Sequence, residues 1–315
     1  MNTPIKKLKQ ELNKAVIGQE AMVEGLIIGL LCDGHILVEG VPGLAKTTTI
    51  NALSKAIGLD SKRIQFTPDL LPSDIIGAQI YNPQDHTFYI KKGPLFTHLL
   101  LADEINRAPA KVQSALLEVM QERQVTIANE SFKLDRPFLV MATQNPIEQE
   151  GVYALPEAQL DRFMMKIIVK HNTQEEELEI MRRGASHTFQ EVEPVLTLET
   201  LQTLQASLSQ IHIDEELERY MVQLIAATRD PEKFGLDMIA QDIMFGASPR
   251  ASIDLYKVAK AKAFLQGKDF VSPSDIGAVA HNVLRHRIVL SYEARAKGIQ
   301  TDTIISTIIE TLPIP

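Results

Sequence analysis

The sequence predicts an α/β fold in which a domain built on a parallel β-sheet is followed by a smaller, all-helical domain. A glycine-rich loop at residues 40–47 lies between a short apolar stretch and a helical stretch, which is the context of a phosphate-binding loop. Apolar runs typical of buried strands alternate with helical segments up to about residue 170. Beyond that point the periodicity is helical. We therefore expect domains at residues 1–172 and 173–315.

The elements expected in the first domain follow from its apolar runs and from helical periodicity. Strands are expected at residues 36–39, 63–66, 99–104, 138–143 and 166–169. Helices are expected at residues 6–16, 21–32, 47–57 and 109–121. Residues 79–90 and residues 124–134 each read as a β-hairpin around a short turn. Both hairpins interrupt the alternation of strands and helices, so they are interpreted as inserts into the sheet domain.

The second domain is expected to be helical because four stretches carry helical periodicity and no stretch reads convincingly as a strand. These four stretches are residues 175–183, 214–229, 250–266 and 275–290. The change from mixed to helical texture places the join between the domains near residues 171–174.

Composition narrows the class of protein. Hydrophobic residues make up 45% of the 315 residues and charged residues 23%, which is ordinary for a globular protein. The net charge of −8 argues against a nucleic-acid duplex as the main partner. Cys32 is the only cysteine, so no internal disulfide forms, and the chain fits a reducing cytoplasm. The apolar stretch at residues 25–32 is too short to span a membrane, so no membrane insertion is expected.

The glycine-rich loop carries the most specific chemistry in the chain. Gly40 and Gly43 let the backbone turn tightly and bring its N–H groups toward an anion, and the next helix adds its positive end. Lys46 can reach the β- and γ-phosphates of a nucleotide, and Thr47 offers a hydroxyl to Mg²⁺. The expected binding residues are Gly40, Val41, Pro42, Gly43, Leu44, Ala45, Lys46, Thr47 and Thr48.

One position of the loop departs from the usual pattern, because Ala45 stands where a glycine normally precedes the lysine. A methyl group is tolerable there if the residue has helical dihedral angles. The competing interpretation is a Gly/Pro-rich turn that only happens to precede Lys-Thr.

Polar residues follow two of the expected strands. Asp103 and Glu104 end the run 99–104, and an aspartate there can hold Mg²⁺ while the adjacent glutamate orients an attacking water. Asn145 follows the strand at residues 138–143 and would point into the same crevice, toward the water or the γ-phosphate. The simpler alternatives are two acids before a turn and an Asn-Pro turn.

Taken together, these motifs resemble an AAA+ ATPase and, more narrowly, the MoxR family. The resemblance rests on the loop with Ala45, on Asp103-Glu104-Ile105-Asn106-Arg107-Ala108-Pro109, on Gln144-Asn145-Pro146-Ile147-Glu148, on Leu155-Pro156-Glu157-Ala158-Gln159-Leu160-Asp161-Arg162-Phe163 and on Gly246-Ala247-Ser248-Pro249-Arg250. It covers nearly the whole chain, from Ile17-Gly18-Gln19 to Arg285-His286-Arg287. The implied fold is a P-loop AAA+ core with two hairpin inserts and a helical lid domain.

The resemblance also implies roles that the residues alone do not indicate. Arg162 would be the arginine finger for a neighbouring subunit, with Arg107 as its rival. Arg250 would sense the γ-phosphate for the lid domain. Ile17, Gly18 and Gln19 would lie near the adenine. The two hairpins would match the helix-2 insert and the pre-sensor insert, which project toward a central pore.

The implied activity is Mg²⁺-dependent ATP hydrolysis by a hexameric ring of this chain. The ring would remodel a client protein or insert a metal cofactor, often with a partner that carries a von Willebrand factor A-type domain. Three alternatives stay open: a nucleotide-dependent binding switch with slow hydrolysis, a magnesium-chelatase-like subunit and a nucleic-acid motor. The net charge makes nucleic acid the least favoured partner.

Overall fold

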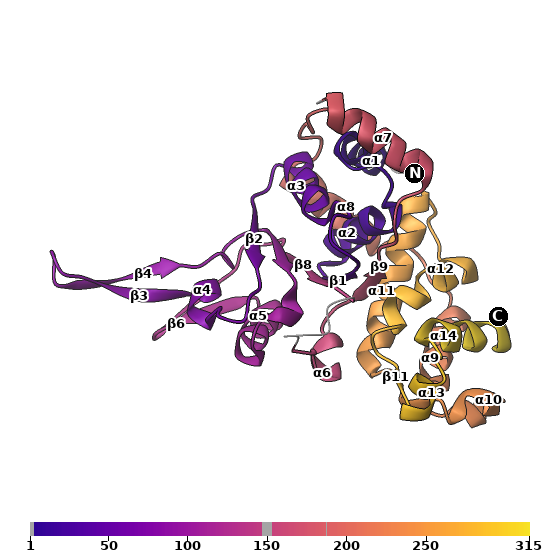
Figure 1. Cartoon of the computed structure of the whole chain (residues 1–315). Helices are drawn as coiled ribbons and strands as arrows, with labels where there is room; N and C mark the ends of the chain where they lie inside the picture. Colours follow the sequence, from indigo (N-terminus) through magenta and orange to yellow (C-terminus); the bar gives the residue numbers. More distant parts are fainter. Residues whose placement is uncertain (1–2, 147–152, 187) are drawn as a thin grey trace.

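A five-stranded parallel sheet lies at the centre of the computed structural model, which describes residues 3–146, 153–186 and 188–315. The strand order is β2-β5-β8-β1-β9 (Figure 1). The strands are β1 (Ile36–Glu39), β2 (Ser61–Gln65), β5 (Leu99–Asp103), β8 (Leu139–Gln144) and β9 (Met165–Ile168). All five expected strands are therefore confirmed, and the α/β fold class with them.

Side chains of the central strands alternate between two apolar clusters, because successive residues of a strand point to opposite faces. Leu99 and Leu101 of β5 belong to one cluster, and Leu100 and Ala102 belong to the other. The first cluster also holds side chains from helices α1 (Thr3–Ala15), α2 (Glu20–Cys32) and α3 (Lys46–Ile57). The second holds side chains from α4 (Pro72–Ile76) and α5 (Ala110–Glu122). The continuous apolar runs in the sequence thus reflect strands buried on both faces.

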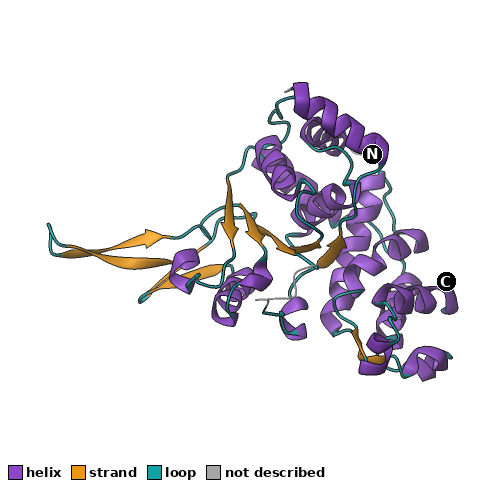
Figure 2. Ribbon diagram, viewed as in Figure 1, coloured by secondary structure: helices purple, strands orange, loops and turns teal. Residues whose placement is uncertain are grey.

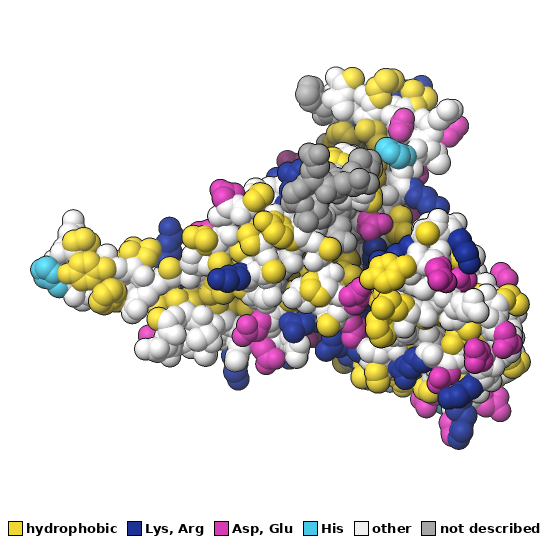
Figure 3. All heavy atoms as spheres, turned by 60° about the horizontal axis from the view of Figure 1, so that its bottom comes forward, with side chains coloured by type: hydrophobic (Ala, Val, Ile, Leu, Met, Phe, Trp, Pro, Cys, Tyr) yellow, Lys and Arg dark blue, Asp and Glu magenta, His cyan; other side chains and the backbone are white. Residues whose placement is uncertain are grey.

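Two antiparallel hairpins extend from the side of the sheet that carries α4 and α5 (Figures 1 and 2). The first pairs β3 (Gly77–Asn82) with β4 (Thr87–Lys92), and the second pairs β6 (Gln124–Ile127) with β7 (Glu130–Lys133). The β3–β4 hairpin is the long arm at the left of Figure 1. Near its tip Tyr81, Phe88 and Tyr89 are 46%, 64% and 50% exposed, and Figure 3 shows hydrophobic side chains beside a histidine there. Both expected hairpins are confirmed.

The C-terminal part is dominated by helices but is not entirely helical. Its helices are α7 (Gln174–Ser186), α8 (Leu198–Leu208), α9 (Glu215–Ala227), η2 (Pro231–Phe234), α10 (Asp237–Ala240), α11 (Pro249–Gln266), α12 (Pro273–Leu284), α13 (Tyr292–Ala296) and α14 (Thr301–Thr311). Two short strands, β10 (Ile243–Phe245) and β11 (Val289–Leu290), pair antiparallel. They are the small strand pair at the lower right of Figure 2.

The strand pair corrects two expectations about this part of the chain. No strand was expected, and a helix was expected over residues 275–290, but α12 ends at Leu284 and the chain then turns into β11. Strands of three and two residues are too short to show a period of two, so their pairing depends on the fold of the whole domain. The remaining elements, η1 (Ile105–Arg107) and α6 (Glu157–Leu160), are short helical turns that follow β5 and precede β9.

One apolar cluster runs across the join between the two expected domains. It includes Leu26 and Ile27 of α2, Leu255 and Val258 of α11, and Ile305 of α14. The helical part therefore packs directly against the sheet domain. The division of the chain into two domains at residue 172 stays a prediction. In the part of the chain that the structure describes, no helix is both long enough and apolar enough to cross a membrane.

Candidate nucleotide-binding site

The glycine-rich loop joins β1 to α3 and leaves room for an anion. Gly43 has a φ of 86°, a conformation that favours glycine, and a Cβ atom placed there would meet nothing within 4 Å. A Cβ atom at Gly40 would come within 3.0 Å of Val169 Cβ, so glycine is needed there for close packing. Lys46 opens α3, is 9% exposed, and donates from Nζ to the carbonyl of Gly40 at 2.8 Å. The loop thus curls around its own lysine at the positive end of a helix.

Ala45 does not have the right-handed helical dihedrals that would make its methyl group easily tolerable. Its φ is 55° and its ψ is 19°, in the left-handed region. An L-residue other than glycine is disfavoured there by about 1–2 kcal/mol. The loop therefore keeps the backbone geometry of a glycine at this position although the side chain is alanine, and this strain is located next to Lys46.

Asp103 lies at the carboxyl end of β5, and each of its oxygens has a partner. Thr143 of β8 donates its hydroxyl to Asp103 Oδ1 at 2.6 Å, and Thr143 Oγ1 in turn accepts from the backbone N–H of Glu104 at 2.9 Å. Arg63 of β2 donates to Asp103 Oδ2 from Nε at 3.2 Å and from Nη2 at 2.6 Å. The carboxylate is thus fixed in orientation by strands on both sides of β5.

Glu104 is held by one side chain from β2 and one from η1, the helical turn that follows Glu104. Its φ of 57° is left-handed, an unusual conformation that is often found at functional sites. Gln65 Nε2 donates to Glu104 Oε2 at 2.6 Å. Arg107 Nε lies 3.3 Å from the same oxygen. Arg107, the rival for the intersubunit contact, thus forms an ion pair with the glutamate of its own chain.

The pocket beside the loop, of about 370 Å³, brings together several of the expected residues. It is lined by Pro42, Gly43, Ala45, Lys46, Thr47, Thr48, Arg63, Gln65, Asp103 and Glu104. Asn145 is buried and follows Gln144, whose carbonyl accepts from the N–H of Gly40 at 3.1 Å. Of the motif that contains Asn145, Ile147 and Glu148 lie outside the described residues.

The turn expected near the adenine lies against the chain that leaves β9. Gln19 Nε2 donates to the carbonyl of Lys170 at 3.1 Å and to Asn172 Oδ1 at 2.9 Å. Asn172 Nδ2 donates to the carbonyl of Ile17 at 3.0 Å. Ile17, Gly18 and Gln19 do not line the phosphate-loop pocket. The segment that they contact continues from Val169, whose N–H donates to the carbonyl of Glu39 just before the loop at 2.8 Å.

Arg63, Gln65 and Thr143 are site residues to which the sequence analysis assigned no role. Each lies on a strand that was expected, but only the strand order places them beside the acids. In the parallel pairing of β2 with β5, Gln65 lies opposite Asp103. The one available signal was the alternation of polar residues in β2, where Arg63 and Gln65 point to the same face of a strand that neighbours apolar runs.

The structure brings Arg162 and Arg250 together, but at a second pocket. This pocket, of about 330 Å³, is lined by Asp33, Gly34, His35, Met120, Gln121, Arg123, Arg162, Met164, Arg250, Ile253, Asp254 and Lys257. It shares no lining residue with the phosphate-loop pocket. Arg250 Nη1 lies 3.5 Å from Asp161 Oδ2. Arg250 therefore lies with the expected arginine finger. A sensor acting within its own chain would instead lie beside the phosphate loop of that chain, and Arg250 does not line that pocket.

The donor set beside the phosphate loop fits Mg²⁺ better than a transition metal. Within residues 3–146, 153–186 and 188–315, no group of three or more His, Cys, Asp or Glu side chains could hold a metal ion. Mg²⁺ is usually bound through one or two carboxylates, with waters and substrate phosphates completing its shell. Asp103 and Thr47, which line one pocket, could supply the carboxylate and the hydroxyl for such a site.

Comparisons with known proteins agree on one family. Residues 35–165 match the family described as ATPase family associated with various cellular activities (AAA), and residues 237–308 match an AAA lid domain. The chain is similar to Chaperone MoxR1 of Mycobacterium tuberculosis, at 47% identity over 97% of this chain and 81% of that one. Protein MoxR of Methylorubrum extorquens is 31% identical over 98% of this chain and 94% of its own. A crystal structure of a protein from Cytophaga hutchinsonii superimposes with a TM-score of 0.94 at 52% identity, covering 99% and 95% of the two chains.

Proposed function

Because the chain belongs to the chaperone-like MoxR family of AAA+ ATPases, we propose that it hydrolyses ATP with Mg²⁺ and couples hydrolysis to work on a client protein. The observation that carries the proposal is the meeting of Lys46, Thr47, Asp103 and Glu104 around one pocket beside the phosphate loop. These four side chains supply a cation, a hydroxyl, a carboxylate for the metal and a carboxylate for water.

Each residue has a stated task in this proposal. The loop N–H groups and Lys46 neutralise phosphate charge, as in other P-loop enzymes. When bound by Thr47 and Asp103, Mg²⁺ would offset negative charge on the β- and γ-oxygens. Glu104 accepts a hydrogen bond from the attacking water and polarises it. Asn145 holds that water or contacts the γ-phosphate.

Two contacts from side chains that line the pocket are proposed to give way before Glu104 and Asp103 act, while the ion pair of Glu104 with Arg107 comes from outside the pocket lining. The Gln65 hydrogen bond occupies Glu104 Oε2, and Arg63 occupies Asp103 Oδ2. Both side chains line the same pocket, so arriving phosphates compete for them. Hydrolysis is therefore proposed to require nucleotide-driven release of these two side chains.

Arg162 and Arg250 are proposed to complete the pocket of a neighbouring subunit. Their shared position at a pocket distinct from the phosphate loop supports this assignment. Among the described residues, no hydrogen bond or ion pair engages the Arg162 guanidinium, which is half-buried. A cation held at this position is suited to a negative charge from outside the chain. An arginine supplied in trans can raise the rate on the order of 10³-fold.

The coupled work is proposed to be remodelling, assembly or metal-cofactor insertion of a client, including one with a von Willebrand factor A-type domain. A hexameric ring in the cytoplasm is the proposed working state. The exposed aromatic residues of the β3–β4 hairpin, Tyr81, Phe88 and Tyr89, are the proposed contact with the client. The alternative, a binding switch with slow hydrolysis, is less favoured because it would not need both Glu104 and a set of intersubunit arginines.

The test is the steady-state ATPase rate per protomer as protein concentration rises. If subunits complete each other's sites, the rate climbs to a plateau, and removing Mg²⁺ abolishes it. A flat, appreciable rate would overturn the intersubunit assignment while leaving the ATPase intact. Absence of turnover at any concentration would favour the binding switch.

A further inference from the structure

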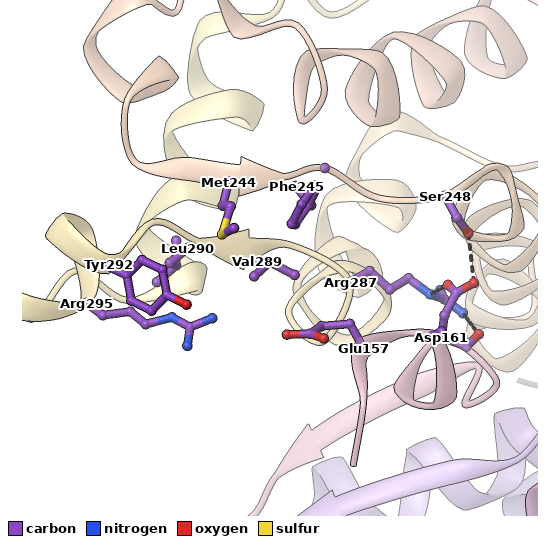
Figure 4. A pocket seen from close by; sticks show the side chains of 12 residues that line it. Glu157, Asp161, Met244, Phe245, Ser248, Arg287, Val289, Leu290, Tyr292 and Arg295 are labelled. Atoms are coloured by element: carbon purple, nitrogen blue, oxygen red, sulfur yellow. Dashed lines mark hydrogen bonds and ion pairs between the residues drawn. The ribbon is translucent and has the colours of Figure 1, made fainter. Parts of the chain in front are cut away.

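An ion pair between Asp161 and Arg287 joins the sheet domain to the helical domain at the residue just before Arg162. Arg287 Nε lies 2.8 Å from Asp161 Oδ1. Figure 4 shows Arg287, on the chain that leaves α12, pointing at Asp161 beside α6. The pair therefore connects the proposed arginine finger to the helical domain through a single peptide bond.

All three nitrogens of the Arg287 guanidinium group make contacts, on both sides of this junction. Its side chain is 1% exposed. Nη2 donates to the carbonyl of Phe163 at 2.9 Å and to the carbonyl of Asp161 at 3.3 Å, and it contacts Asp254 Oδ2 at 2.5 Å. Nη1 donates to the carbonyl of Val283 at 3.0 Å. Arg287 thus holds the backbone on both sides of Arg162 as well as the carboxylate of Asp161.

Asp161 also contacts the residues that present Arg250. Ser248 donates its hydroxyl to Asp161 Oδ2 at 2.9 Å, and the same hydroxyl accepts from the N–H of Arg250 at 3.2 Å. Arg250 Nη1 donates to the carbonyl of Asp161 at 3.3 Å. Asp161 faces the N-terminal end of α11, where a negative charge is favoured. One carboxylate, on the residue just before Arg162, therefore contacts both Arg250 and Arg287.

The burial of Arg287 points to a role in positioning. A buried ion pair adds little to stability over an apolar pair of similar volume, because desolvation of the charges offsets their attraction. Burial does raise the pKa of the Asp254 carboxyl, despite the nearby Arg287. What the planar guanidinium supplies is direction, since its donors are fixed in a rigid fork. Lysine, with a single ammonium group, cannot reproduce five such contacts.

We propose that Asp161 and Arg287 form a latch that positions Arg162 and Arg250 as one unit for the neighbouring subunit's nucleotide. Arg287 is then a positioning residue that acts through Asp161. The inference rests on the proposed trans role of Arg162 and Arg250. It adds that the helical domain, through Arg287, determines where Arg162 of the sheet domain is placed.

The test separates the subunit that donates arginines from the subunit that hydrolyses ATP. Glu104→Gln protomers lack the water-orienting carboxylate but keep their arginines. Arg162→Ala protomers lack the finger but keep their own pocket. Mixing the two variants should restore ATPase activity at each interface where a Glu104→Gln protomer faces the pocket of an Arg162→Ala protomer.

Arg287→Lys is then added to one partner at a time. On the Glu104→Gln protomer it should reduce the restored activity by about tenfold or more, because small misplacements of catalytic groups are costly. On the Arg162→Ala protomer it should leave the restored activity unchanged. This asymmetry would not arise from a general loss of stability, which would affect both mixtures.

Arg285→Lys is the matched control, because Arg285 belongs to the same segment and holds the carbonyl of Lys166 and Asp302 without touching Asp161. It should leave both mixtures unchanged. If Arg287→Lys does not fold, Ser248→Ala replaces it and should show the same asymmetry, with a smaller loss. Equal losses in the two placements, or no loss in either, would overturn the latch. A plain mixture that restores nothing would instead contradict the trans arrangement itself.

Discussion

The phosphate-loop pocket and the arginine pocket are built in different ways from the same chain. The first is formed by one continuous loop and by the ends of neighbouring strands, with Lys46 and Thr47 adjacent in sequence. The second gathers residues from four separate stretches, which include Asp33, Arg123, Arg162 and Arg250. The first pocket therefore depends mainly on local backbone geometry. The second depends on how the helical domain is fastened to the sheet.

The largest expected effect concerns the phosphate-loop pocket. Glu104→Gln should lower kcat by about 10²–10⁴-fold, because an amide cannot act as a general base toward water. Binding of ATP should persist, since Lys46 and the loop are unchanged. Parallel measurement of kcat and of the ATP dissociation constant checks both parts.

Glu118→Gln is the control for this variant, because Glu118 is an exposed glutamate on α5 and lines neither pocket. It should leave the rate unchanged. If Glu104→Gln hydrolysed ATP at the wild-type rate, Glu104 would have no part in the proposed chemistry. The contrast between a catalytic pocket and a positioning pocket would then be weaker.

A second prediction concerns pH and the arginine pocket, whose wall contains His35. His35 Nδ1 accepts from the N–H of Val140 at 3.0 Å, and Nε2 faces the carbonyl of Met120 at 3.0 Å. Burial, aided by the charge of Arg123, lowers the pKa of His35 to about 3. In the unfolded chain the pKa of histidine is about 6.5. As the pH falls from about 6.5 toward 3, the imidazole of His35 is therefore protonated in the unfolded state but stays neutral in the folded state.

The free energy of unfolding should therefore fall as the pH decreases through this window. From pH 7 to pH 5, His35 alone should account for a loss of about 2 kcal/mol. Denaturant titrations of the wild type and of His35→Gln at both pH values give the slope of the free energy of unfolding against pH, which should be smaller for the variant. The pKa of His286 is also lowered by burial, so the variant should keep part of the slope. Identical slopes in the two proteins would show that His35 takes up its proton in the folded state.

The smallest expected effect concerns the hydrogen bond from Gln65 to Glu104. Gln65→Ala should raise the ATPase rate by up to about tenfold, because a hydrogen bond to a charged group is worth roughly 1.5 kcal/mol at the lower end of its range, and Arg107 still holds the same oxygen of Glu104. Steady-state rates at saturating ATP test this. Lys62→Ala, on the same strand but directed at the carbonyl of Phe96, should leave the rate unchanged. A rate that falls would mean that Gln65 orients Glu104 for catalysis rather than restraining it.

The contrast between the pockets also explains what the sequence could predict. The phosphate loop, the five strands and both hairpins were predicted because each is specified by a short stretch of residues. Gln65 was missed because its role depends on β2 lying beside β5. The conformation of Ala45 was missed because a residue type does not fix the sign of φ. The meeting of Arg162 and Arg250 follows from the packing of two domains, and only family resemblance suggested that either mattered.

The β3–β4 hairpin has a mechanical consequence. Its six-residue strands, at about 3.3 Å per residue, give an arm of about 20 Å. A rotation of the sheet domain by about 10° would sweep the tip of such an arm through roughly 3.5 Å, about one residue of extended chain. If the proposed work on a client is correct, the hairpin would act as a lever, and a small rotation at the nucleotide would move its tip by a step of the size of the client's own backbone repeat.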